Sequence, residues 1–138
     1  MVPMDVERAL RDALKGEDEI VWAYLFGSAV RGGAYRDVDV AVMPAPGAFS
    51  RLTDLGRLQV RLSAALDREV DLVDLRRASL LLLGPILRER RVLRDRDVRA
   101  RHCWEAETAS RVLDYEPVIG RYSSLRRERL RLRRARGA

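Results

Sequence analysis

The most constraining stretch of the chain is residues 37–43, which read Asp-Val-Asp-Val-Ala-Val-Met. Side chains of a β-strand point to alternate faces of the sheet, so this alternation predicts a strand with one buried and one polar face. Asp37 and Asp39 share the polar face because they lie two residues apart. Two carboxylates this close repel each other unless a cation lies between them. The segment therefore predicts a strand that is anchored by its valines and chemically active on its other face.

The rest of the chain alternates between extended and helical patterns. The predicted strands are residues 19–26, 37–43, 69–75 and 91–94, the last as a short edge strand. Helical spacing of apolar residues predicts helices over residues 5–14, 50–66, 79–88 and 97–113, with a short helical turn at 29–31. We expect Pro85 to shorten or bend the third of these helices. This order predicts an α/β domain with a small mixed sheet flanked by helices.

The composition of the 138 residues fits one domain with one core, because 47% of the residues are hydrophobic. The net charge of +6 comes almost entirely from arginine, since Lys15 is the only lysine. A basic surface predicts a polyanionic partner such as a nucleotide or a nucleic acid. A bias toward arginine codons explains the same charge equally well.

Cysteine content and hydropathy exclude some classes of protein. Cys103 is the only cysteine, so no disulfide can form within the chain. Neither Cys103 nor His102 has a partner at metal-ligand spacing. The longest apolar run, residues 80–83, is too short to cross a bilayer, and residues 1–13 lack a signal-type apolar stretch. We expect a soluble, cytoplasmic protein without membrane association.

The sequence pattern changes near residue 97. We expect residues 1–96 to form the main domain and residues 97–138 to form a C-terminal helical arm. Residues 124–136 contain seven arginines and one glutamate. Such a segment could bind nucleic-acid phosphates, but it lacks interleaved aromatic residues, so a solvated tail is the more common outcome.

The candidate chemistry begins at Gly27-Ser28, which ends one predicted strand and opens a helical turn. Such a turn offers free backbone N–H groups to an anion, and glycine allows a phosphate to approach closely. The Ser28 hydroxyl adds a donor. Eight residues separate this turn from Asp37 and Asp39, whose hard oxygen ligands suit Mg²⁺.

A third carboxylate is expected on the strand at residues 69–75. Asp71 and Asp74 point to opposite faces of that strand, so only one of them can join Asp37 and Asp39. A carboxylate there could share a metal ion and take a proton from an attacking hydroxyl. Each feature is weak alone, and their coupling at adjacent strand ends is what makes the pattern specific.

The stretch Leu25-Phe26-Gly27-Ser28-Ala29-Val30-Arg31-Gly32, followed by Asp37-Val38-Asp39-Val40-Ala41-Val42, resembles the DNA polymerase β-like nucleotidyltransferase superfamily. Within it the chain is similar to the minimal nucleotidyltransferases (MNT), including residues 70–75, 86–88 and 92–93 of their closing half. The resemblance covers roughly residues 5–96. It departs in one respect: between Gly-Ser and Asp-x-Asp the family commonly has about ten residues, whereas this chain has eight. The missing pair falls in the loop at residues 33–36.

The resemblance implies a role for each candidate residue. Gly27 and Ser28 would contact the phosphates of ATP or another NTP. Asp37 and Asp39 would bind the metal, expected to be two Mg²⁺ ions. Asp71 would be the third carboxylate of the site, and Asp74 is the alternative for that role. Arg31 would touch phosphate or form a structural ion pair, and the resemblance does not decide between the two.

The C-terminal segments at residues 104–108 and 113–117, with Tyr122, are similar to the tail of MNT antitoxins that pair with HEPN toxins. The resemblance implies adenylylation of a tyrosine of a HEPN ribonuclease, with ATP as donor, and direct binding of that toxin. Two alternatives stay open: an antitoxin that acts by binding alone, and a nucleotidyltransferase of a small molecule. A homo- or hetero-oligomer also stays open.

Overall fold

A four-stranded mixed sheet organises the chain, in the order β3-β2-β1-β4. The computed structural model describes residues 4–31 and 37–115. The strands are β1 (Ile20–Phe26), β2 (Asp37–Pro44), β3 (Glu69–Asp74) and β4 (Arg91–Asp95). β1 runs antiparallel to both of its neighbours, whereas β2 and β3 are parallel. A parallel pair needs a crossover connection, which the helix between β2 and β3 provides.

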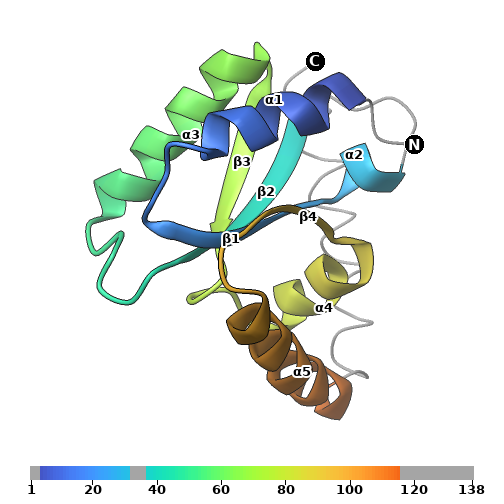
Figure 1. Ribbon diagram of the computed structural model, residues 1–138. Coiled ribbons are helices and arrows are strands. Elements are labelled where there is room, and N and C mark those ends of the chain that lie inside the picture. The colour runs from blue at the N-terminus through green and yellow to red at the C-terminus, as the bar shows by residue number, and fades with distance from the viewer. Residues whose placement is uncertain (1–3, 32–36, 116–138) are drawn as a thin grey trace.

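Helices cover both faces of the sheet. They are α1 (Met4–Leu14), α2 (Ser28–Arg31), α3 (Leu52–Leu66), α4 (Leu80–Glu89) and α5 (Val98–Asp114). Figure 1 shows α1 and α3 on one side of the sheet and α4 and α5 on the other, with α2 at the end of β1. The predicted α/β fold with a mixed sheet is confirmed. Pro85 lies inside α4, which nevertheless continues to Glu89.

Some expectations lie outside the described residues, namely those on the loop at 33–36, on Tyr122 and on residues 124–136. Within residues 4–31 and 37–115, no helix has both the length and the apolar character that a membrane span needs.

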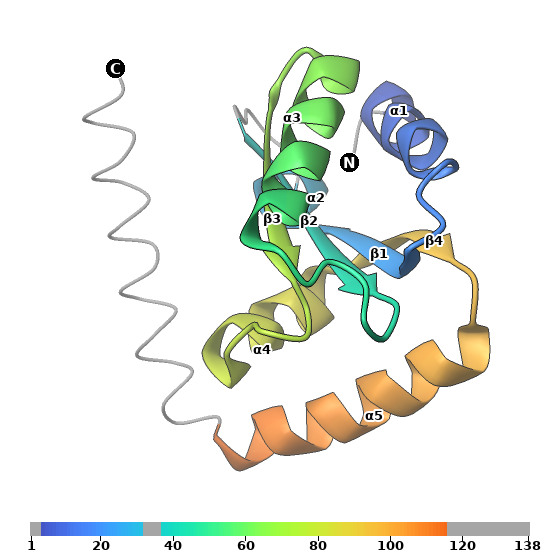
Figure 2. The ribbon, with the colours of Figure 1, turned by 90° about the vertical axis from the view of Figure 1, so that its left-hand side faces the viewer.

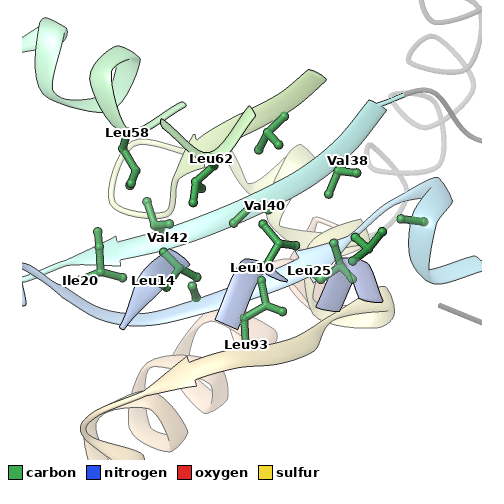
Figure 3. Close-up of a cluster of buried hydrophobic side chains, with 14 of the residues drawn as sticks. Leu10, Leu14, Ile20, Leu25, Val38, Val40, Val42, Leu58, Leu62 and Leu93 are labelled. Carbon is green, nitrogen blue, oxygen red and sulfur yellow. The ribbon is translucent and has the colours of Figure 1, made fainter. Parts of the chain in front are cut away.

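The face under α1 and α3 carries an aliphatic core, shown in Figure 3. Its central members are Leu10, Leu14, Leu25, Val38, Val40, Val42, Leu58 and Leu62, all of them buried. The valines of β2 come from alternate positions, as the strand pattern predicts. Burial of each such side chain contributes about 1.5–3 kcal/mol, so this face fixes the register of β2 and the direction in which its aspartates point.

The face under α4 and α5 is aromatic and contains a buried charge. The hydroxyl of Tyr24 donates to Oε2 of Glu105 at 2.6 Å, and Arg90 and Arg101 donate to the same carboxylate. The ring of Trp104 lies 5.8 Å from that of Trp22 between centroids. Helix α5, expected as an arm, is thus joined to the sheet, and Figure 2 shows it running beneath α4 and β4.

The titration of this buried network follows from its contacts. Burial, reinforced by the hydrogen bond to Glu105, raises the pKa of Tyr24 well above its ordinary value. Burial alone would raise the pKa of Glu105 as well. The hydrogen bond from Tyr24 and the charges of Arg90 and Arg101 outweigh that effect, so the pKa of Glu105 lies below its ordinary value. The network therefore holds a charged carboxylate within the packing of α5.

Candidate active site

Three of the predicted aspartates meet where β2 and β3 begin. Asp39 is the register partner of Asp71 in the parallel ladder, and Asp37 lies two residues earlier on the same face. Asp71 shares that face, because its neighbours Val70 and Leu72 pack into the aliphatic core on the other. All three aspartates are half-buried. We call Asp37, Asp39 and Asp71 the acidic corner.

The Gly27-Ser28 turn lies directly against the acidic corner. Phe26, the last residue of β1, is the register partner of Asp39. Gly27 follows with a φ of +82°, and a β-carbon added to it would lie 2.3 Å from Oδ2 of Asp39. A side chain at position 27 would therefore collide with that carboxylate and strain the backbone. The Gly-Ser turn and the Asp-x-Asp strand, which the sequence analysis predicted to act together, are therefore in contact.

Ser28 opens a tight helical turn beside this contact. It is the first residue of α2, and the backbone N–H groups of Val30 and Arg31 donate to the carbonyl of Gly27 at 3.1 and 3.2 Å. Ser28 itself is half-buried. This geometry has the strand, turn and helix order expected of a phosphate-binding turn.

Asp74 lies away from the acidic corner. Its carboxylate is only 8% exposed, and its Oδ2 accepts a hydrogen bond from Nη2 of Arg76 at 2.9 Å. The backbone N–H and Nε of Arg76 donate to Oδ1 at 2.9 and 3.2 Å. Of the two candidates on β3, Asp71 is therefore the one that lies beside Asp39, and Asp74 is held by Arg76.

Arg31 is engaged by a residue that sequence reasoning missed. Its Nη1 donates to Oε1 of Glu89 at 2.5 Å, while the N–H of Gly27 donates to Oε2 of the same side chain at 2.9 Å. Of the two roles weighed for Arg31, the structural ion pair is thus present. The sequence held one signal for Glu89: a glutamate that ends a helix opposes the helix dipole and calls for another reason to be there.

Mg²⁺ is the ion that the acidic corner suits chemically, since carboxylate oxygens are its preferred protein ligands. Within the described parts of the chain, no three acidic, histidine or cysteine side chains are already arranged to hold a metal ion. Neighbouring strands are about 4.8 Å apart. Asp39 and Asp71, as register partners on neighbouring strands, are therefore candidates to share one ion.

The fold and this corner define the class of protein. Residues 8–99 match the family described as polymerase beta nucleotidyltransferase, which is well over half of the chain. The chain therefore belongs to the polymerase beta nucleotidyltransferase family, as the sequence predicted.

Within this family, individual proteins and solved structures are similar to the chain. The protein adenylyltransferase MntA of Shewanella oneidensis is 41% identical over 68 residues, which cover 46% of this chain and 46% of that protein. The chain thus matches about half the length of this curated relative. A crystal structure of a toxin–antitoxin with AMP-PNP aligns with a TM-score of 0.66 at 25% identity, over 90% of this chain and 98% of that one.

A second solved structure supports the same fold. It contains a tri-AMPylated Shewanella oneidensis HEPN toxin in complex with an MNT antitoxin. Its matching chain aligns with a TM-score of 0.64 at 24% identity, over 92% of this chain and 98% of that one.

Proposed function

We propose that this protein is a Mg²⁺-dependent nucleotidyltransferase that transfers AMP from ATP to a tyrosine of a HEPN-type ribonuclease toxin, and so acts as an antitoxin. The observation that carries the proposal is the contact of the Gly27 turn with Asp39, which in turn lies beside Asp71. The similarity to MntA and to chains of solved toxin–antitoxin structures supports the choice of donor and acceptor.

The residues would divide the chemistry between binding and proton transfer. The N–H of Gly27 already donates to Glu89, so the backbone N–H and the hydroxyl of Ser28 would hold the phosphates of ATP. Asp37, Asp39 and Asp71 would hold Mg²⁺, which neutralises phosphate charge when bound. The tyrosine oxygen would attack the α-phosphorus, the bond to the β-phosphate would break, and pyrophosphate would leave. Asp71 would accept the tyrosine proton.

A second candidate is an antitoxin that neutralises by contact alone. One observation favours it: the apolar side chains of Leu113 and Tyr115 are 66% and 53% exposed near the end of α5. A protein partner could cover those side chains. This candidate needs no nucleotide chemistry at the acidic corner.

Label transfer from α-labelled ATP separates the two candidates. The wild type is incubated with Mg²⁺ and a purified HEPN toxin, beside Asp39→Asn and a matched control, Asp12→Asn at an exposed position of α1. We expect label on the toxin with the wild type and the control, and a loss of about 1,000-fold with Asp39→Asn. Equal absence of label with the wild type and Asp39→Asn would reject the enzyme.

Toxin neutralisation in cells tests the second candidate. An antitoxin that acts by contact predicts that Asp39→Asn still protects cells, whereas a variant with both Leu113→Ser and Tyr115→Ser does not. An enzyme predicts that Asp39→Asn fails to protect even though it still binds the toxin.

A further inference from the structure

Glu89 holds the turn that the proposed function needs, from a position 62 residues away in the sequence. We propose that Glu89 is a positioning residue: its carboxylate bridges the N–H of Gly27 and the guanidinium of Arg31, and so fixes the Gly27-Ser28 turn against Asp39 for nucleotide binding. This inference rests on the proposed function and assigns a residue to it that touches neither metal nor substrate.

The register of the sheet explains why Glu89 reaches Gly27. In the antiparallel β1–β4 ladder, Tyr24 pairs with Val92 and Leu25 with Arg91. Two residues further along the same register, Gly27 faces Glu89. The backbone there belongs to α4 and not to a strand, because α4 ends at Glu89. The side chain of Glu89 therefore accepts the N–H that β4 would have accepted, at 2.9 Å.

One carboxylate holds both ends of the turn. Oε2 accepts from Gly27, which precedes α2, and Oε1 accepts from Arg31, which ends it. The Arg31 side chain is 57% exposed, so this ion pair adds little to overall stability. Two contacts on one rigid group nevertheless fix both the position and the orientation of the four-residue helix between them.

Glu89 and Asp39 contact the turn from opposite sides. β1 has β2 on one side and β4 on the other. Glu89 approaches Gly27 from the β4 side, whereas Asp39 contacts it from the β2 side. A displacement of the turn would alter the distance between its donors and the acidic corner, and misplacement of about 1 Å can cost about 100-fold in rate.

The helix dipole argues that Glu89 is not kept for the stability of α4. As the last residue of the helix, its negative charge lies at the negative end of the dipole, where it is disfavoured. Replacement by alanine removes this unfavourable charge but leaves the N–H of Gly27 without its acceptor, so the net change in thermal stability should be small. A positioning role therefore predicts that stability and activity move independently, which a purely structural role does not.

The test compares Glu89→Ala and Glu89→Gln with Arg88→Ala, an exposed neighbour on the same helix end. Hydrogen exchange of the peptide at residues 26–31 is measured without nucleotide, and kcat/KM for ATP is measured in the label-transfer assay. For Glu89→Ala we expect at least tenfold faster exchange and at least tenfold lower kcat/KM, with little change in the Tm. Glu89→Gln should lie between, because its amide oxygen still accepts from Gly27, and Arg88→Ala should match the wild type.

Two results would overturn the proposal: unchanged exchange across the turn in Glu89→Ala, or an unchanged or higher kcat/KM in that variant when the wild type is active. A higher value would mean that the carboxylate competes with phosphate for Gly27 and Arg31. An inactive wild type would refute the proposed function instead, and hydrogen exchange would then decide alone whether Glu89 holds the turn.

Discussion

Two groups of carboxylates in this chain are treated in different ways. Asp74 and Glu105 are 8% and 9% exposed, and arginines of the same domain donate to both of them. The acidic corner is half-buried, brings Asp39 beside Asp71, and has the backbone of Gly27 pressed against it. The first arrangement lowers the cost of a buried charge, whereas the second concentrates negative charge beside a turn of backbone donors.

This difference separates the carboxylates that stabilise the folded protein from those of the candidate active site. Breaking a buried ion pair leaves an uncompensated charge and destabilises the protein. Removing one of several neighbouring carboxylates also removes their mutual repulsion, which offsets part of any loss. Substitutions in the two groups should therefore affect different measurements, and the four that follow are ordered by expected effect.

The largest effect is expected for Asp71→Asn in the acidic corner. The amide can neither take a proton from the acceptor nor contribute charge to a metal site, so transfer should fall about 1,000-fold. The free energy of unfolding should stay within about 1 kcal/mol of the wild type, since the side chain is half-buried beside Asp39. Label transfer and urea unfolding check the two halves of this prediction. Activity within tenfold of the wild type would remove Asp71 from the site.

Gly27→Ala should affect both measurements. The new methyl group would lie 2.3 Å from Oδ2 of Asp39 and would hold alanine at a φ of +82°. We expect transfer to fall about 100-fold and the free energy of unfolding to fall by about 1–3 kcal/mol. The matched control is Gly16→Ala, at an exposed glycine where no atom lies within 4 Å of the added carbon, and it should retain activity. Equal behaviour of the two variants would show that the contact with Asp39 is unimportant.

Asp74→Ala should affect stability alone. Arg76 would lose three hydrogen bonds to the carboxylate while still donating to the carbonyl of Ala48. We expect the free energy of unfolding to fall by about 2 kcal/mol, less than for a fully buried pair because Arg76 is partly exposed. Transfer per folded molecule should be unchanged. A fall of transfer as large as that of Asp71→Asn would place Asp74 in the site after all.

The smallest effect is the acid dependence supplied by Glu105. Its pKa is lower in the folded protein than its ordinary value of 4.5. Its contribution to stability is therefore complete above that pH and is lost as the pH falls through the folded pKa. We expect Glu105→Gln to be less stable by about 1 kcal/mol at pH 7 and to differ less from the wild type near pH 3. Thermal unfolding across this range measures the difference, and a constant gap at all pH values would contradict it.

Local features of the sequence allowed much of the site to be predicted. The alternation at residues 37–43 fixed the face of Asp37 and Asp39, and the strand end at Phe26 located the Gly27-Ser28 turn. The spacing of Asp71 and Asp74 showed that they face opposite ways, but the choice between them depended on which face Val70 and Leu72 bury.

The missed residues depend on pairings that are remote in the sequence. Glu89 reaches Gly27 across 62 residues, and Glu105 reaches Tyr24 across 81. Neither pairing leaves a periodic signal in its own segment. The packing of α5 on the sheet depends on equally remote contacts, since Tyr24 and Trp22 lie on a strand near the opposite end of the chain.

The packing of Trp104 against Trp22 gives this protein a built-in optical reporter. These are its only two tryptophans, and both lie at the junction of α5 with β1. Intrinsic fluorescence therefore senses whether α5 is seated on the sheet, through a shift of the emission to longer wavelength when the indoles become hydrated. Detachment of α5 can therefore be followed through the tryptophan emission of the unlabelled, unmodified protein.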